Sequence, residues 1–151
     1  MKNPRTSLSL MALLVIPEDL VGQLYDAFAK KFPEHEEFWS TLAEEEVHHA
    51  NLVCTLELKA LGKRKFNPNP VLNSLDYLRV LLANAQQDLS LRIALMWAVQ
   101  IETYMLENKF FEVDKQDDAK VKRVLGTLAA ETKAHAERLR ELQSKIAHAG
   151  G

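Results

Sequence analysis

One short segment occurs twice in the chain, and it limits the possible fold more than any other feature of the sequence. Residues 42–50 read LAEEEVHHA, and residues 128–136 read LAAETKAHA. Aligned without a gap, the two copies share Leu, Ala, Glu, His and Ala at the same positions. The repeat indicates a chain built from two similar helical units.

The first copy contains a Glu-x-x-His motif, formed by Glu46 and His49. Side chains three residues apart lie on one face of an α-helix, so this pair can share one cation. In the second copy Thr132 occupies the position of Glu46, and only the histidine, His135, remains. The sequence therefore predicts a metal-binding helix face and leaves open whether the second copy completes the site.

Apolar residues recur at three- and four-residue steps almost throughout, and the chain has only five Gly and five Pro. This pattern predicts an all-α fold. We expect an antiparallel four-helix bundle of two helical hairpins, with a short crossover helix, in a single domain spanning residues 1–151. The four long helices are expected at 7–31, 33–61, 89–113 and 118–147, and the crossover helix at 74–86.

Polar side chains interrupt the apolar stripes of these helices at matching depths. Glu18 and Glu46 are equally far in sequence from Phe32, where the first hairpin is expected to turn. Glu102 and Thr132 are equally far from the second expected turn. Because a helix rises about 1.5 Å per residue, the two residues of each pair are expected at the same height along their hairpin. If the hairpins pack together, five groups meet in one layer as the predicted metal site: Glu18, Glu46, His49, Glu102 and His135.

A bound cation is the simplest reason for such a layer. Three carboxylates buried together would repel one another and lose hydration, at a cost of several kcal/mol per charge. Taken singly, an inward Glu or His is more often a core residue with satisfied hydrogen bonds. The coincidence of five such groups at one depth is what indicates metal binding.

Composition argues against several other classes of protein. The 19 Lys and Arg residues and 21 Asp and Glu residues are interspersed, with a net charge of -2, so no nucleic-acid partner is expected. No apolar stretch approaches the roughly 20 residues that cross a bilayer, so no membrane partner is expected. The single cysteine, Cys54, allows neither an internal disulfide nor a Cys-x-x-Cys site. Such cysteine usage fits a reducing compartment and predicts a cytoplasmic protein.

A wider pattern spans nearly the whole chain. It consists of Glu18 with residues 24–28 (LYDAF), residues 38–46 (FWSTLAEEE) with His49 and Ala50, Ile101 with Glu102, and residues 128–131 (LAAE) with His135. This pattern resembles the ferritin-like superfamily, and most closely the diiron domain of rubrerythrins and their short relatives. That family uses one Glu from each of two helices and Glu-x-x-His from each of the other two.

The resemblance implies a role for each residue of the layer. Glu18 and Glu102 would be terminal carboxylate ligands, Glu46 a bridging carboxylate, and His49 and His135 terminal imidazole ligands. The second bridging position is Thr132, and a hydroxyl is a poor replacement for a carboxylate. The second ion should therefore bind more weakly, or a single-metal site remains.

Glu131 offers one way to replace the missing carboxylate. It precedes His135 by four residues, which is also a one-face spacing on a helix. A modest rotation of the helix or a one-residue π-bulge would bring Glu131 inward, and such bulges are frequent at functional sites. We treat this as a hypothesis about the backbone around residue 131.

The resemblance implies non-haem di-iron chemistry in which peroxide or dioxygen is reduced, with manganese and zinc as alternative metals. Because the sequence has no cysteines for a rubredoxin-like domain, electrons would come from an external donor. Tyr25 is expected as a core tyrosine, or as a hydrogen-bond donor or redox-active group near the site. The alternative function is a bundle that lost di-iron chemistry and serves as a metal-binding or protein-interaction module. A homodimer is compatible with the sequence, which does not indicate the surface used.

Overall fold

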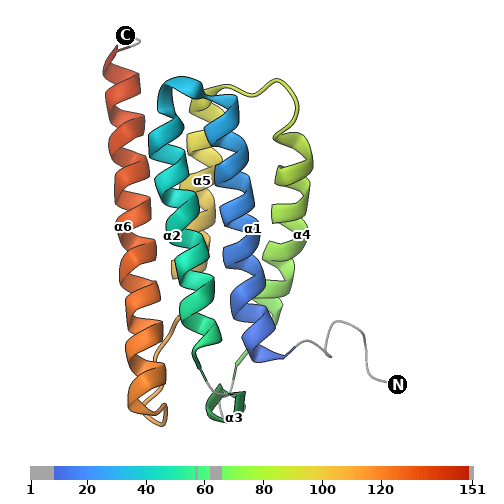
Figure 1. Cartoon of the computed structure of the whole chain (residues 1–151), viewed down its shortest axis with the longest axis vertical. Helices are drawn as coiled ribbons and strands as arrows, with labels where there is room; N and C mark the ends of the chain where they lie inside the picture. Colours follow the sequence, from blue (N-terminus) through green and yellow to red (C-terminus); the bar gives the residue numbers. More distant parts are fainter. Residues whose placement is uncertain (1–8, 57, 62–65, 150–151) are drawn as a thin grey trace.

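The computed structural model describes residues 9–56, 58–61 and 66–149, and within them the protein is helical, with no strand. The all-α fold and the four-helix bundle are therefore confirmed. α1 packs against α2, and α5 packs against α6, so the bundle consists of two hairpins (Figure 1). The long helices are α1 (Leu10–Lys31), α2 (Glu36–Cys54), α5 (Leu91–Glu107) and α6 (Ala119–Ala149).

The crossover helix α4 (Asn69–Asn84) lies against α1 and carries the chain back along the bundle (Figure 1). As a result, α5 begins at the same end as the turn between α1 and α2. A hydrogen bond from Lys31 Nζ to the backbone oxygen of Gln87 joins the two connections at this end. Each hairpin is antiparallel, while α2 and α5 run in the same direction (Figure 1).

The first hairpin begins and ends where its charges and caps favour it. The hydroxyl of Ser9 accepts the Ala12 N–H at 3.1 Å and so caps α1. The last turn of α1 carries Lys30 and Lys31, and the first turn of α2 carries Glu36 and Glu37, which complement the helix dipoles. The short η2 (Pro33–His35) makes the turn between them. Residues 7 and 8, where the first helix was expected to begin, lie outside the described part.

The helix expected over 33–61 is a correction, because α2 ends at Cys54. The Thr55 N–H bonds to the Leu52 oxygen at 3.1 Å, a tighter turn than the α-helix, and the Thr55 hydroxyl bonds to the same oxygen at 2.6 Å. Lys120 Nζ, from α6, donates to the freed Thr55 oxygen at 2.7 Å. Helical structure resumes only as the short α3 (Leu58–Leu61).

The crossover helix was expected over 74–86 and instead spans Asn69–Asn84. Its early start is explained by Pro70, which fits the first turn because an N–H is not needed there. The second hairpin also differs from the expected 89–113 and 118–147. Its first helix starts at Leu91, where the Ser90 hydroxyl accepts the Ile93 N–H at 3.2 Å. Its second helix ends at Ala149, two residues beyond the expected end.

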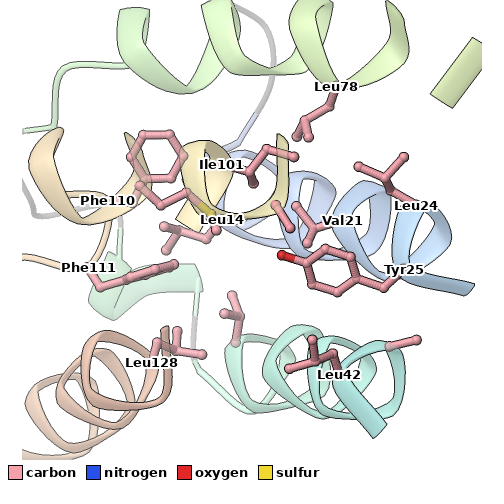
Figure 2. Close-up of a cluster of buried hydrophobic side chains, with 14 of the residues drawn as sticks. Leu14, Val21, Leu24, Tyr25, Leu42, Leu78, Ile101, Phe110, Phe111 and Leu128 are labelled. Atoms are coloured by element: carbon pink, nitrogen blue, oxygen red, sulfur yellow. The ribbon is translucent and has the colours of Figure 1, made fainter. Parts of the chain in front are cut away.

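The helix expected to reach residue 113 stops at Glu107 because the chain turns to bury two aromatic rings. Lys109 adopts a positive φ of 56°, and the Phe110 N–H bonds back to the Met105 oxygen at 3.1 Å. Phe110 and Phe111 then point into the core, as Figure 2 shows. Burial of two rings outweighs two further turns of helix.

The core lies between the hairpins and under α4. Side chains from every long helix meet in it (Figure 2): Leu14, Val21 and Tyr25 of α1, Leu42 of α2, Leu78 of α4, Ile101 of α5 and Leu128 of α6. Trp39 is fully buried, with ring centroids 4.9 Å from Phe28 and 5.5 Å from Tyr25. This apolar packing fixes the spacing of the helices that carry the polar layer.

None of the described helices is both long enough and apolar enough to cross a lipid bilayer.

Candidate metal centre

The five residues predicted as metal ligands lie together in the middle of the bundle. Each has an exposed fraction of 1% or less, and they come from four helices: Glu18 from α1, Glu46 and His49 from α2, Glu102 from α5 and His135 from α6. Charged side chains are almost never buried this completely without partners. The structure thus brings the predicted groups together, while metal binding by them stays a prediction.

Glu46 lies between the two imidazoles and reaches both. Its Oε1 is 3.0 Å from Nδ1 of His135, and its Oε2 is 3.5 Å from Nδ1 of His49. The imidazole rings are stacked, with centroids 5.1 Å apart. Glu46 therefore occupies the position from which one carboxylate can contact two neighbouring cations.

The two remaining carboxylates lie one at each imidazole. Glu18 Oε2 is 3.4 Å from His49 Nδ1, and Glu102 Oε1 is 3.4 Å from His135 Nδ1. Together with Glu46 they define two half-sites, each with one imidazole, one carboxylate of its own and a share of Glu46. Donor atoms of Glu46, His49 and His135 all lie within 4.8 Å of one another, close enough to hold one ion.

The outer nitrogen of each imidazole contacts a carboxylate from the opposite helix. Glu45 of α2 lies 2.8 Å from Nε2 of His135, and Glu131 of α6 contacts Nε2 of His49. Arg138 forms an ion pair with Glu45. A carboxylate at Nε2 favours the tautomer that carries its hydrogen there, which leaves a lone pair on Nδ1 directed to the centre.

The sequence analysis did not identify a role for Glu45, which lies about 100° around the helix from Glu46. Both outer carboxylates are in fact part-exposed, Glu45 at 39% and Glu131 at 41%, so they do belong to the flank. Their side chains are long enough for the carboxylates to contact the imidazoles. The repeat contained the signal, because Glu45 and Glu131 occupy equivalent positions in its two copies.

Thr132 lies in the same layer, with an exposed fraction of 1%. The π-bulge offered as one route to an inward Glu131 is absent, because α6 is a regular α-helix throughout residues 125–139, although Glu131 does reach His49. Glu131 instead approaches His49 at Nε2, whereas Glu18 and Glu46 approach the same ring at Nδ1. No carboxylate of α6 thus takes the second bridging position.

Four buried oxygens of the layer have no hydrogen-bond partner among the described residues: Glu18 Oε1, Glu46 Oε2, Glu102 Oε2 and Thr132 Oγ1. A buried polar atom left unpaired costs about 1–3 kcal/mol, and more when it is charged. Carboxylate oxygens and imidazole nitrogens are the donors that divalent iron, manganese and zinc accept. The residues present therefore fit a divalent metal.

Without a metal, burial and neighbouring charges shift the pKa values of the carboxylates and imidazoles of the layer. Burial raises the pKa of Glu18 well above its usual range, and the neighbouring Glu46 raises it further. Burial alone would lower the pKa of His49, but contacts with the Glu18 and Glu46 carboxylates outweigh it and raise that pKa to about 11. Similarly, contacts with Glu102 and Glu46 raise the pKa of His135 to about 10. A metal ion bound through these imidazoles would compete with the protons that the raised pKa values favour.

Tyr25 and Gly22 of α1 shape the layer from one side. The Tyr25 hydroxyl donates to Glu102 Oε1 at 2.7 Å, and burial together with the Glu102 charge raises the pKa of Tyr25 well above its usual range. Tyr25 is thus a protonated donor that orients Glu102. At Gly22, an added Cβ would lie 3.3 Å from the Cβ of Glu46, so the missing side chain allows α1 to approach α2 closely beside the centre.

Comparison with known proteins agrees with this arrangement. A family model described as Rubrerythrin matches residues 18–143, a range that begins at Glu18 and includes every residue of the centre. Comparisons with curated proteins and with solved structures gave no match.

Proposed function

Because the chain belongs to the rubrerythrin family, we propose that it is a non-haem iron-carboxylate protein that reduces peroxide or dioxygen with electrons from a separate donor. The observation that supports this proposal most is the buried layer with its four unpartnered oxygens. An enzyme of this class needs acidic and imidazole ligands that meet away from bulk water. The meeting of acidic and imidazole side chains in a buried layer supports the proposal.

Five side chains would hold the metal. Glu18 and Glu102 would be the terminal carboxylates, Glu46 the shared one, and the Nδ1 atoms of His49 and His135 the nitrogen ligands. Ferrous iron, when bound, supplies electrons to the oxidant and stabilises negative charge on its oxygen atoms. Manganese and zinc accept the same ligands, so the metal's identity is part of the proposal.

The chain's own residues would prepare this chemistry in three ways. Glu45 and Glu131 hold the imidazole Nε2 atoms and so direct the Nδ1 lone pairs inward. Tyr25 keeps a proton on its hydroxyl, 2.7 Å from Glu102, and fixes that carboxylate. The surrounding core excludes water, which strengthens every charge interaction in the layer.

The electron donor is proposed to be a separate protein or domain. The 151 residues contain one cysteine, Cys54, whereas an iron centre of the rubredoxin type needs four cysteine ligands. Reducing equivalents must therefore reach the centre from outside this bundle.

The test is the reaction of the ferrous-loaded protein with peroxide under anaerobic conditions. We expect oxidation of bound iron at a rate that falls strongly in His49→Ala and His135→Ala variants. His48→Ala is the matched control, because His48 is exposed on the same helix. Iron that binds to the unmodified protein but does not react with peroxide would contradict the proposed reaction.

A second candidate function has one specific observation in its favour, which is Thr132 at the second bridging position. Under this reading the bundle kept its fold and binds metal without efficient turnover, as a metal-binding or interaction module. Iron content and turnover separate the two functions. Two irons with rapid peroxide-driven oxidation favour the enzyme, and one metal or none without turnover favours the module.

A further inference from the structure

Thr132 departs from the family's pattern at the centre of the buried layer. Its side chain has an exposed fraction of 1%, and its Oγ1 has no hydrogen-bond partner among the described residues. Most buried hydroxyls are paired, and each unpaired one calls for an explanation. A ligand that accepts a hydrogen bond from Thr132 would provide it.

The position of Thr132 indicates what that ligand replaces. In the repeat, Thr132 is equivalent to Glu46, which alone among the carboxylates of the described residues contacts both imidazoles. The equivalence also holds in space, because Glu45 contacts His135 and Glu131 contacts His49. Threonine ends where glutamate would continue to its carboxylate. The α6 side of the layer therefore lacks a carboxylate that would face both half-sites.

The charge balance of the layer also indicates that a negatively charged ligand is missing. With neutral imidazoles, the inward carboxylates Glu18, Glu46 and Glu102 carry three negative charges, whereas two divalent cations carry four positive charges. Glu131 does not correct this locally, because its carboxylate is engaged at the far nitrogen of His49. One negative charge is missing, at a position where an uncompensated charge is expensive.

We propose that the centre contains a binding site for a small carboxylate anion beside Thr132, and that the second divalent cation binds only together with this anion. An anion of the size of formate or acetate supplies both the charge and the carboxylate that α6 lacks. The Thr132 hydroxyl donates a hydrogen bond to it. One cation then binds by protein ligands alone, and the second depends on the anion. This inference rests on the proposed function only in assigning the same five residues as ligands.

The experiment counts cobalt ions bound to the metal-free protein at equilibrium. Co²⁺ accepts the same ligands, does not require anaerobic handling at the divalent state, and its visible absorption reports its coordination. Dialysis is performed in sodium perchlorate, whose anion coordinates weakly, and in sodium formate at equal ionic strength. We expect one Co²⁺ per chain in perchlorate and two in formate.

Two variants locate the effect at Thr132. Thr132→Glu is expected to bind two Co²⁺ in perchlorate, because it restores the carboxylate within the chain. Thr132→Val keeps the space but removes the donor, so the formate concentration for half-filling of the second site should rise by about tenfold or more. Circular dichroism verifies that each variant is folded, and the formate dependence of the unmodified protein stands without them.

Other outcomes overturn the inference in distinguishable ways. Two Co²⁺ in perchlorate, or one in both salts, would show that no anion completes the centre. One Co²⁺ in folded Thr132→Glu would show that position 132 does not face the second cation. An unchanged formate requirement in Thr132→Val would exclude the hydroxyl as donor. If no Co²⁺ binds in either salt, the proposed function fails together with the inference.

Discussion

At the scale of single residues, the centre depends on side chains in two shells. In the proposed centre the inner carboxylates and imidazoles would supply the donor atoms, and the outer carboxylates of Glu45 and Glu131 would orient the imidazoles. Outer partners of this kind typically contribute 10- to 100-fold to metal affinity. Their half-exposed position makes them suitable for mutation, because the change does not leave a cavity in the core.

Replacement of Glu131 by Gln should weaken metal binding by roughly 10- to 100-fold, since the amide removes the negative charge beside His49 Nε2. Glu45→Gln should act similarly through His135. The matched control is Glu44→Gln, an exposed neighbour on α2. Competition with a chromophoric chelator measures the affinity. Equal affinities for the Glu131 and Glu44 variants would contradict the role assigned to Glu131.

The raised pKa values of His49 and His135, about 11 and 10, make the metal-free protein sensitive to pH. An unfolded histidine titrates near 6.5, so the folded state binds these protons more tightly. The resulting stabilisation is fully present below about pH 6.5 and is lost as the pH rises through about 10 to 11. The midpoint of thermal unfolding of chelator-treated protein should therefore fall from pH 7 to pH 10.

The corresponding control is a variant with both imidazoles removed, His49→Gln with His135→Gln, in which most of this dependence should disappear. Metal affinity of the unmodified protein should follow the opposite trend and increase with pH, because a cation competes with the same protons. Thermal stability of the metal-free protein that increases between pH 7 and pH 10 would refute the assignment.

At the scale of helices, packing against the core decides where elements end. The helical pattern predicted the existence and order of the long helices, because apolar stripes at three- and four-residue steps are a strong signal. Their ends were less predictable. α2 stops at Cys54 through side-chain and backbone contacts of Thr55, one of which comes from Lys120, far away in sequence. α5 stops at Glu107 because Phe110 and Phe111 enter the core.

The candidate site also has residues that the sequence predicted and one that it did not. Glu18, Glu46, His49, Glu102 and His135 were found from the sequence because each interrupts an apolar stripe at a matching depth. Glu45 was not found, because its contact depends on the reach of a flexible side chain across two helices. Helical periodicity places a Cβ on a face, and it does not predict where a long polar side chain ends.

The close approach of α1 and α2 at Gly22 gives a test at this scale. In Gly22→Ala the new Cβ would lie 3.3 Å from the Cβ of Glu46, so Glu46 must shift by a few tenths of an ångström. Metal affinity should decrease. The control is Gly126→Ala on α6, where nothing lies within 4 Å and alanine should stabilise the helix by about 0.5–1 kcal/mol.

Chemical denaturation and metal titration of both glycine variants provide the measurement. The same substitution should have opposite effects at the two positions. It should raise the stability of the protein at position 126 and lower the metal affinity of the centre at position 22. A Gly22→Ala protein with unchanged metal affinity would show that the spacing of α1 and α2 is not a constraint on Glu46.

At the scale of the whole molecule, the two hairpins enclose three carboxylates and two imidazoles, the group proposed to bind a cation. Binding to the folded state alone should stabilise it by about 2.7 kcal/mol at a hundredfold excess of metal over Kd. For a chain of this length, this is a rise of roughly 5 to 10 °C in Tm. Scanning calorimetry with and without chelator measures the shift. Glu46→Gln should show little of it, and an equal shift in that variant would place the metal elsewhere.

The central claim is that side chains from four helices hold a metal between His49 and His135. It is tested most directly by anomalous diffraction at the iron absorption edge, on crystals grown anaerobically with ferrous iron. We predict an anomalous peak within coordination distance of Glu46 and of Nδ1 in both imidazoles. A fully loaded crystal with no peak in this layer, or with iron only on the surface, would contradict it.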